Sequence, residues 1–179
     1  MQVFHYINDW NSFRYSINHS NTIGFVPTMG AIHKGHLSLI EESLKHNDLT
    51  IVSIFVNPTQ FNDEDDYKGY PIDNNNDLVL LKNIGADAII FPQNNEIYAD
   101  KYKFMISEYS LSKIMEGKYR PNHFNGMLTV VMKLINIVNP TISYFGEKDY
   151  QQFLLVQEMV LAFFMNTKIV LCPTIREND

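Results

Sequence analysis

Apolar residues along the chain alternate between helical spacing and short continuous runs. Asn8 and Asp9 favour a helix N-terminus, and the apolar positions from Trp10 to Ile17 follow them at helical spacing, which predicts an amphipathic first helix. The apolar run at 22–26 then predicts a buried strand.

A second alternation follows directly. Residues 27–33 interrupt the apolar pattern, helical spacing resumes at positions 37, 40 and 44, and residues 49–56 form a continuous apolar run. Two buried strands joined by a helix make a βαβ unit, which favours a parallel sheet with right-handed crossovers.

The alternation continues to the end of the chain. It predicts helices at 77–84, 127–138 and 153–164, and strands at 88–91, 142–145 and 168–171, with Gly85 ending the first of these helices. The predicted fold is therefore α/β, a doubly wound Rossmann-like parallel sheet with helices on both faces. Such a sheet binds ligands outside the carboxyl ends of its strands, where the strand order reverses.

Two segments do not follow this pattern. Residues 57–76 are polar and carry the acidic run at 63–66, and we expect a functional lid or a solvated loop there. Residues 92–125 predict one short helix near 111–115.

Composition narrows the classes of protein. A chain of 179 residues with 45% apolar content can bury one core as a single domain. A formal charge of -6 without a Lys/Arg cluster argues against nucleic-acid binding. The single Cys172 and the lack of a leading apolar segment indicate the cytoplasm, and the apolar runs are too short to predict a membrane span.

The strongest candidate site is the segment MGAIHKGH, from Met29 to His36, where a strand meets a helix. Helix N-termini attract phosphate through unpaired N–H groups and a partial positive charge. His33 and His36 lie on the same side of that turn, and Gly35 leaves room for a ligand near the backbone. Surface histidines or a pair of metal ligands are the alternatives, although no further Cys/His set with zinc-like spacing accompanies them.

A second candidate segment, FGEKDYQQ at 145–152, also lies between a strand and a helix. Lys148 can place a point charge on phosphate, Asp149 can accept hydrogen bonds from ribose hydroxyls, and Gln152 lies one turn further on. The alternative is a charged turn with Asp149 as an N-cap.

Two weaker segments complete the set. In FVNPTQF at 55–61, Gln60 could bind a carboxylate or hydroxyl, and an ordinary Asn-Pro turn is the alternative. In RPNHFNG at 120–126, a polar loop before a helix, Arg120 could pair with phosphate or carboxylate, and a surface salt bridge is the alternative. Three of the four segments follow predicted strands, where an open α/β sheet places its ligand.

Together, in this order and spacing, the four segments resemble the pantothenate synthetase family over nearly the whole chain. The HxGH element alone indicates only the wider nucleotidylyltransferase superfamily, whereas GEKDYQQ and NPTQF narrow the resemblance to this family. The resemblance implies a cytoplasmic homodimer that makes pantothenate from pantoate, β-alanine and ATP with Mg2+. The implied route runs through a pantoyl-adenylate and releases AMP and pyrophosphate.

The resemblance also implies residue roles. His33, His36 and Lys148 would be catalytic and contact the ATP phosphates, with His36 as proton donor. The further ATP contacts implied are Met29, Gly30, Gly35, Gly146, Glu147, Asp149 and the backbone of Ile175. The implied contacts to pantoate or β-alanine are Gln60, Gln152, Met29 and Arg120, and Asp77 is the implied Mg2+ contact.

The resemblance sets the expected domain organisation. Residues 1–175 correspond to an N-terminal nucleotide- and pantoate-binding domain, and 176–179 to the start of a hinge to a C-terminal lid domain that this chain lacks. Without a lid to exclude water, we expect weak binding and slow turnover. Asn122 departs from the family by replacing a glycine, which would stiffen the arginine loop.

Two other functions stay open from sequence alone. One is a nucleotidylyltransferase that moves AMP onto a phosphate monoester, and the other is a non-catalytic ATP-binding or dimerisation module.

Overall fold

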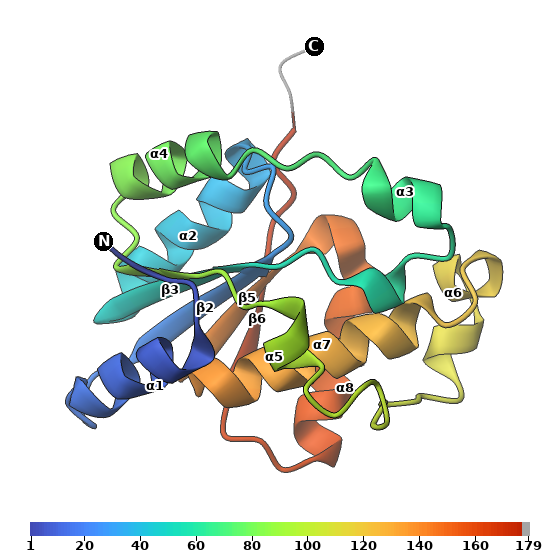
Figure 1. Ribbon diagram of the computed structural model, residues 1–179. Helices are drawn as coiled ribbons and strands as arrows, with labels where there is room; N and C mark the ends of the chain where they lie inside the picture. Colours follow the sequence, from blue (N-terminus) through green and yellow to red (C-terminus); the bar gives the residue numbers. More distant parts are fainter. Residues whose placement is uncertain (177–179) are drawn as a thin grey trace.

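Six parallel strands form one sheet in the computed structural model, which describes residues 1–176 (Figure 1). The strands are β1 (Gln2–Phe4), β2 (Ile23–Thr28), β3 (Leu49–Ile54), β4 (Ala88–Ile90), β5 (Ile142–Gly146) and β6 (Lys168–Cys172). Their order across the sheet is β1-β4-β3-β2-β5-β6, and every described pair is parallel. The predicted doubly wound α/β fold is confirmed.

Helices connect these strands and cover both faces of the sheet. The α-helices are α1 (Ile7–Ser16), α2 (Lys34–His46), α3 (Glu64–Lys68), α4 (Asn74–Ile84), α5 (Asn94–Ile97), α6 (Glu116–Tyr119), α7 (His123–Val138) and α8 (Tyr150–Ala162). Three short 3-10 helices are η1 (Pro58–Gln60), η2 (Leu111–Lys113) and η3 (Glu147–Asp149). None of the helices in residues 1–176 combines the length and the apolar character that crossing a bilayer requires.

Two apolar clusters hold the layers together. On one face, α1, α7 and α8 pack against the sheet around residues such as Trp10, Phe25 and Val156, which are fully buried. On the other face, α2 and α4 pack around Ile40 and Leu81, also fully buried (Figure 1). Helices on both faces explain why the central strands read as continuous apolar runs rather than as alternating patterns.

The strand order reverses between β2 and β5. These two strands lie side by side, with Gly24 opposite Ile142 and Phe25 opposite Ser143, although more than a hundred residues separate them in sequence. A sheet of this kind binds ligands outside the carboxyl ends of the strands at such a switch point. The first two predicted motifs follow β2 and β5 and therefore flank it.

Several predicted boundaries move in the structure. β1 was not predicted, because three partly exposed residues at the sheet edge give too short a pattern. α1 begins at Ile7 rather than after Asn8 and Asp9, and the Ile7 N–H donates to Glu96 Oε1 at 2.9 Å. This cap comes from a residue far away in sequence, so the local pattern could not reveal it. β2 continues through Pro27 to Thr28, beyond the last residue paired with β5.

The polar segments are also more ordered than predicted. Residues 57–76 contain η1, α3 and the start of α4 instead of one long loop. Residues 123–126 form the first turn of α7 rather than a loop before it, and α8 begins at Tyr150, three residues earlier than predicted. The helix expected near 111–115 is the 3-10 helix η2, followed by α6. Gly85, with a φ of 94°, ends α4 as predicted.

Candidate active site

The loop after β2 is shaped by a buried carboxylate beneath it. Gly30 and Ala31 have positive φ angles of 89° and 50°, and both oxygens of Asp77 accept backbone hydrogen bonds, from Ala31 N at 2.9 Å and Ile32 N at 2.7 Å. A Cβ atom on Gly30 would lie 3.0 Å from Asp77 Oδ2, so glycine is required both for the turn and for this contact.

These partners give Asp77 a structural role that the sequence analysis did not predict. Its side chain is 1% exposed, and each oxygen already serves a backbone N–H of the loop. Asp77 therefore shapes the loop, and its implied contact with Mg2+ stays a prediction.

His33 and His36 come together at the start of α2. Their ring centroids are 4.1 Å apart with a tilt of 30°, so the predicted pairing on one side of the turn is confirmed. His33 is the N-cap, and its Nδ1 accepts the N–H of Gly35 at 3.0 Å. In the neutral ring the proton therefore lies on Nε2, which can donate to a ligand.

Gly35 has a different purpose from the one predicted. A Cβ atom at this position would lie 2.8 Å from His33 Cε1. The space beside the glycine is thus filled by the imidazole of its own neighbour rather than left for a ligand. Glycine allows His33 to fold back over the helix start and to contact the ring of His36.

His36 is held neutral. Burial lowers its pKa to about 4, and the positive charges of His33 and Lys148 contribute in the same direction. Its Nδ1 atom is buried and has no hydrogen-bond partner in the described structure. The unused buried nitrogen of His36 lies near Lys148, and a bound anion would raise the pKa of this imidazole because negative charge nearby favours its protonated form.

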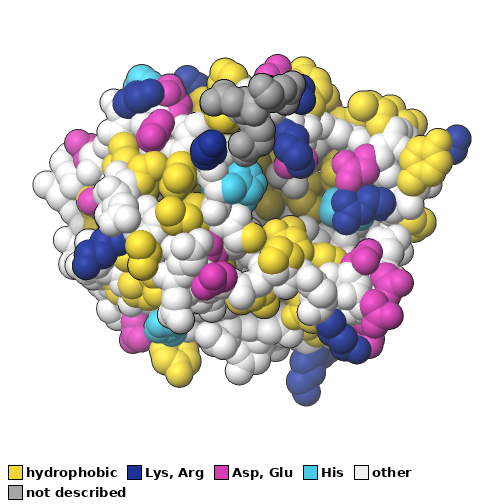
Figure 2. Space-filling view, turned by 90° about the horizontal axis from the view of Figure 1, so that it is seen from above, with side chains coloured by type: hydrophobic (Ala, Val, Ile, Leu, Met, Phe, Trp, Pro, Cys, Tyr) yellow, Lys and Arg dark blue, Asp and Glu magenta, His cyan; other side chains and the backbone are white. Residues whose placement is uncertain are grey.

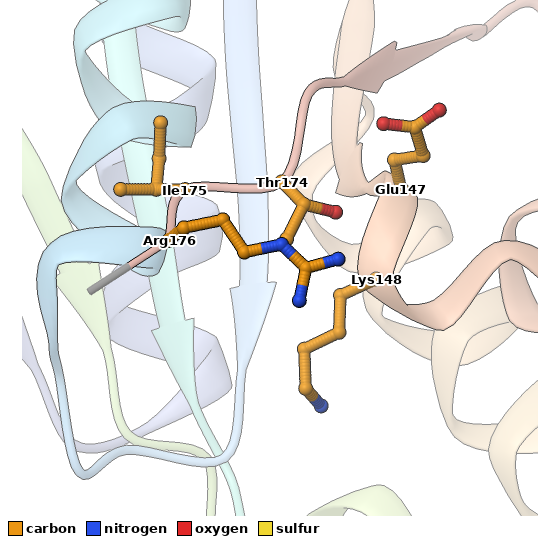
Figure 3. Close-up of a pocket in the computed structure, with 5 residues that line it drawn as sticks. All are labelled: Glu147, Lys148, Thr174, Ile175 and Arg176. Atoms are coloured by element: carbon orange, nitrogen blue, oxygen red, sulfur yellow. The ribbon is translucent and has the colours of Figure 1, made fainter. Parts of the chain in front are cut away.

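A cleft opens between the end of β5 and the segment after β6. Its volume is about 770 Å3, and it is lined by Glu147, Lys148, Thr174, Ile175 and Arg176. The side chains of Lys148 and Arg176 extend into the same opening (Figure 3). Seen from this end of the sheet, the molecule has a hollow bordered by histidine and by Lys or Arg side chains (Figure 2).

The η3 residues face solvent at this cleft. Lys148 and Asp149 have exposed side chains, and Lys148 Nζ lies 3.4 Å from Asp149 Oδ1. Asp149 makes no side-chain N-cap bond to α8, so the alternative that it caps this helix is not supported. A Cβ on Gly146 would meet open space.

Gln60 lies in the wall next to the β2 loop. Its side chain is 8% exposed, its Oε1 accepts from Asn57 Nδ2 at 3.2 Å, and its Nε2 donates to Met29 Sδ at 3.0 Å. The third motif thus contacts the first, and the alternative of an isolated Asn-Pro turn does not describe it.

His123 lies between Gln60 and the residues that follow β5. Its Nδ1 lies 2.7 Å from the carbonyl oxygen of Gln60. The pKa of His123 is lowered chiefly by burial, while the nearby charge of Asp149 acts in the opposite direction. The first turn of α7 therefore lies between η1 and η3, within electrostatic reach of both.

These contacts bring several of the predicted residues close together. Lys148 influences His36 across the switch point, and Gln60 contacts Met29 of the loop that carries His36. Residues from four segments that are far apart in sequence are thereby linked at the carboxyl end of the sheet. Gln152 lies half-buried in the first turn of α8, close to the same strand end.

Arg120 forms a surface salt bridge, which was the alternative to its pairing with a phosphate or carboxylate. Its Nη1 lies 2.7 Å from Glu116 Oε1, an i,i+4 ion pair on a partly exposed surface. Asn122 adopts a left-handed φ of 65°, a conformation that asparagine tolerates better than most residues and that glycine adopts freely. Asn122 therefore keeps the backbone turn that a glycine would make.

Sequence analysis missed the residues that hold the site together. Asn57, His123 and Gln151 are buried polar residues whose partners lie in other segments. Each stands inside a motif already singled out, so a polar residue next to a candidate ligand was the available signal. In residues 1–176, no three His, Cys, Asp or Glu side chains gather to hold a metal ion.

Comparison with known proteins gives the family. The model of the pantoate-beta-alanine ligase family matches residues 2–179. Pantothenate synthetase of Legionella pneumophila (strain Lens) is 55% identical over 100% of this chain and 71% of the relative. The crystal structure of pantoate-beta-alanine ligase from Francisella tularensis, complexed with beta-gamma ATP and beta-alanine, has a TM-score of 0.97 and 47% identity over 99% of this chain and 68% of that chain.

A second structure agrees. Pantothenate synthetase from Thermus thermophilus has a TM-score of 0.92 and 39% identity, over 99% of this chain and 63% of that chain. The family model spans almost every residue of the chain, and the relatives are 39–55% identical to it over nearly its whole length. The chain belongs to the pantoate-beta-alanine ligase family.

Proposed function

We propose that this chain carries the site that condenses pantoate with β-alanine at the expense of ATP, through a pantoyl-adenylate. The observation that carries the proposal is that His36 lies within electrostatic reach of Lys148 at the β2/β5 switch point, while Gln60 contacts both His123 and Met29 of the loop that carries His36. Membership of the ligase family and the Francisella complex with beta-gamma ATP and beta-alanine support the choice of substrates.

The basic side of the hollow suits the triphosphate. Lys148 and Arg176 extend into the cleft, α2 directs its N-terminal end toward the switch point, and His33 offers Nε2–H. When the pantoate carboxylate attacks the α-phosphorus, a new O–P bond forms, and the bond to the bridging oxygen breaks as pyrophosphate leaves. Fixed positive groups lower the repulsion between these two anions, so catalysis rests on positioning and charge.

His36 is suited to change its protonation state when ATP binds. Its low pKa keeps it neutral in the free protein, and a triphosphate beside it would raise that pKa. In the bound state His36 would donate a proton or hydrogen bond to the oxygen that leaves with pyrophosphate. The second step transfers the pantoyl group to the β-alanine amine and releases AMP.

The neutral side of the hollow suits pantoate. Gln60 offers an amide rather than a charge, and Gln152 lies in the neighbouring first turn of α8. An amide orients a carboxylate without pairing it so tightly that its oxygen loses nucleophilicity. Arg120 would have to leave Glu116 to contact a substrate, which assigns it to a later or mobile contact.

The proposal also includes Mg2+, a homodimer and a hinge to a lid domain. Mg2+ commonly binds through substrate phosphates and few protein ligands, so it would enter with ATP. Exposed apolar residues such as Phe104 and Tyr109 fit a homodimer contact, and the single buried Cys172 fits the reducing cytoplasm. Arg176, the first residue of the expected hinge, lines the cleft, whereas 177–179 lie outside the described residues.

Exchange of labelled pyrophosphate into ATP tests the first step. We expect exchange that needs pantoate but not β-alanine, and a loss of at least tenfold in Lys148→Ala. Lys168→Ala is the matched control, because Lys168 is exposed at the start of β6, the opposite end of the strands.

The same assay has three outcomes against the proposal. Exchange that requires a phosphorylated acceptor instead of pantoate would make the chain a nucleotidylyltransferase. ATP binding without any pantoate response would leave a binding module. Equal loss in Lys148→Ala and Lys168→Ala would remove Lys148 from the phosphate site.

A further inference from the structure

The amide of Asn57 has only one orientation that its backbone neighbours allow. One end faces the carbonyl oxygen of Gly126 at 3.1 Å, and the other faces the N–H of Thr59 at 3.4 Å. A carbonyl can only accept and an N–H can only donate. Nδ2 therefore faces Gly126, and Oδ1 faces Thr59.

The orientation of Asn57 fixes that of Gln60. The second N–H of Asn57 Nδ2 points to the Gln60 side chain at 3.2 Å, so the atom that receives it must be the amide oxygen, Oε1. The NH2 group of Gln60 then points the other way, where it meets Met29 Sδ at 3.0 Å. A thioether is a weak acceptor, so this NH2 keeps donor capacity for a stronger partner.

The hydroxyl of Tyr98 contacts the oxygen end of the Asn57 amide. Its hydroxyl donates to Asn57 Oδ1 at 2.6 Å and lies 2.9 Å from Thr59 Oγ1. The side chain is 4% exposed, and burial is the main reason that its pKa rises to about 12. The phenol therefore keeps its proton across the working pH range and can donate at all times.

The ring of Tyr98 is itself fixed. Lys133 of α7 places Nζ 4.6 Å from the ring centroid and donates to the carbonyl oxygen of Ile97 at 2.7 Å and to Asp100 Oδ1 at 2.8 Å. Tyr102 stacks on the same ring at 4.3 Å. A ring held by a cation and an aromatic neighbour has little freedom to swing its hydroxyl away.

We propose that Tyr98 is a positioning residue that, through Asn57, keeps the NH2 group of Gln60 directed at Met29 in the loop after β2, as a hydrogen-bond donor available to a substrate. A substrate group at this point must then be an acceptor, either a carboxylate or a hydroxyl oxygen. This inference rests on the proposed function, in which Gln60 contacts pantoate.

Replacement of Tyr98 by phenylalanine tests the chain of contacts. Tyr98→Phe leaves the ring but removes the hydroxyl that donates to Asn57 Oδ1, so the Asn57 amide keeps its orientation and is held less firmly beside Gln60. We expect the KM for pantoate in pyrophosphate exchange to rise about tenfold, the effect of one hydrogen bond of ordinary strength, while the KM for ATP changes less than about twofold. A general loosening of the fold would move both constants.

Tyr102→Phe is the matched control. Tyr102 stacks on Tyr98, but its hydroxyl accepts from Asn94 on the half-exposed outer side and has no bond to Asn57. We expect wild-type KM values for this variant. Equal pantoate KM values in Tyr98→Phe and Tyr102→Phe would overturn the proposal.

A second variant tests the same orientation without depending on Tyr98. Gln60→Glu keeps the shape but replaces the NH2 donor by an oxygen. A rise in pantoate KM of at least tenfold supports the proposal, and an unchanged KM overturns it. Wild-type chain that shows no pantoate-dependent exchange would instead sink the proposed function, so the two failures are distinguishable.

Discussion

Replacing Asp77 by asparagine separates its structural role from a metal-binding one. Both carboxylate oxygens accept backbone N–H bonds, at 2.9 and 2.7 Å, and the side chain is 1% exposed. In Asp77→Asn one oxygen becomes an NH2 group that faces a donor. One hydrogen bond to a charged acceptor is worth about 1.5–3 kcal/mol, so we expect the free energy of unfolding to fall by about 2–3 kcal/mol.

Asp73→Asn provides the matched control on the same helix. Asp73 is the exposed N-cap of α4, and its Oδ1 accepts from Asn76 N at 3.1 Å. Asparagine caps helices about as well as aspartate, so this change should alter the free energy of unfolding by less than about 0.5 kcal/mol. Urea denaturation at neutral pH measures both variants.

The Mg2+ dependence of pyrophosphate exchange decides between the two roles. If Asp77 shapes the loop, Asp77→Asn should lower stability and weaken ATP binding, but leave the Mg2+ concentration for half-maximal rate unchanged. A variant of wild-type stability that needs much more Mg2+ would refute our reasoning and restore the metal contact.

Three further changes probe other parts of the site. Gly126→Ala would place Cβ in a clash with the carbonyl oxygen of Thr59; we expect the free energy of unfolding to fall by about 1–3 kcal/mol and the pantoate KM to rise, measured by urea denaturation and pyrophosphate exchange. Gln151→Leu removes three hydrogen bonds to backbone groups of residues 111–116 and should cost about 3 kcal/mol, measured in the same way; no change would show that these bonds are not formed. For His36, the folded protein binds fewer protons than the unfolded chain between the ordinary pKa of 6.5 and about 4. Stability should therefore be complete above this window and fall by about 3 kcal/mol as pH drops through it, and His36→Asn should remove most of that fall in unfolding measured near pH 7.5 and pH 4.5.

The sheet and its switch point could be predicted because they depend on local pattern. Buried central strands have continuous apolar runs, and Gly85 ends α4 with the positive φ that favours glycine. Once the strands are parallel, their carboxyl ends must lie at one edge. That constraint alone predicts that His36, Lys148 and Gln60 lie together, and the described contacts among their segments agree with it.

The supporting residues could not be predicted because their partners are far away in sequence. In the sequence, Asp77 is only an acidic residue near a helix start. The structure shows that it accepts hydrogen bonds from the backbone N–H groups of Ala31 and Ile32. Gly35 suggested room for a ligand, yet the contact that requires glycine is with His33 two residues earlier. In both cases the sequence identified an important position. The reason for its importance is the direction of a side chain, which residue spacing does not predict.

The division of charge around the hollow explains how an acidic chain can handle an anionic substrate pair. The pantoate carboxylate and the ATP phosphates are both negative, and the two anions need different protein groups beside them. Cations at Lys148 and Arg176 can offset the phosphates, while the carboxylate of Asp77 is buried and accepts hydrogen bonds from backbone N–H groups of the loop. A second strong cation beside the nucleophile would hold its oxygen in an ion pair, whereas a donor of fixed direction at Gln60 can orient it and leave it reactive. The net charge of -6 is therefore no obstacle, because catalysis depends on where charge lies at the switch point rather than on the total.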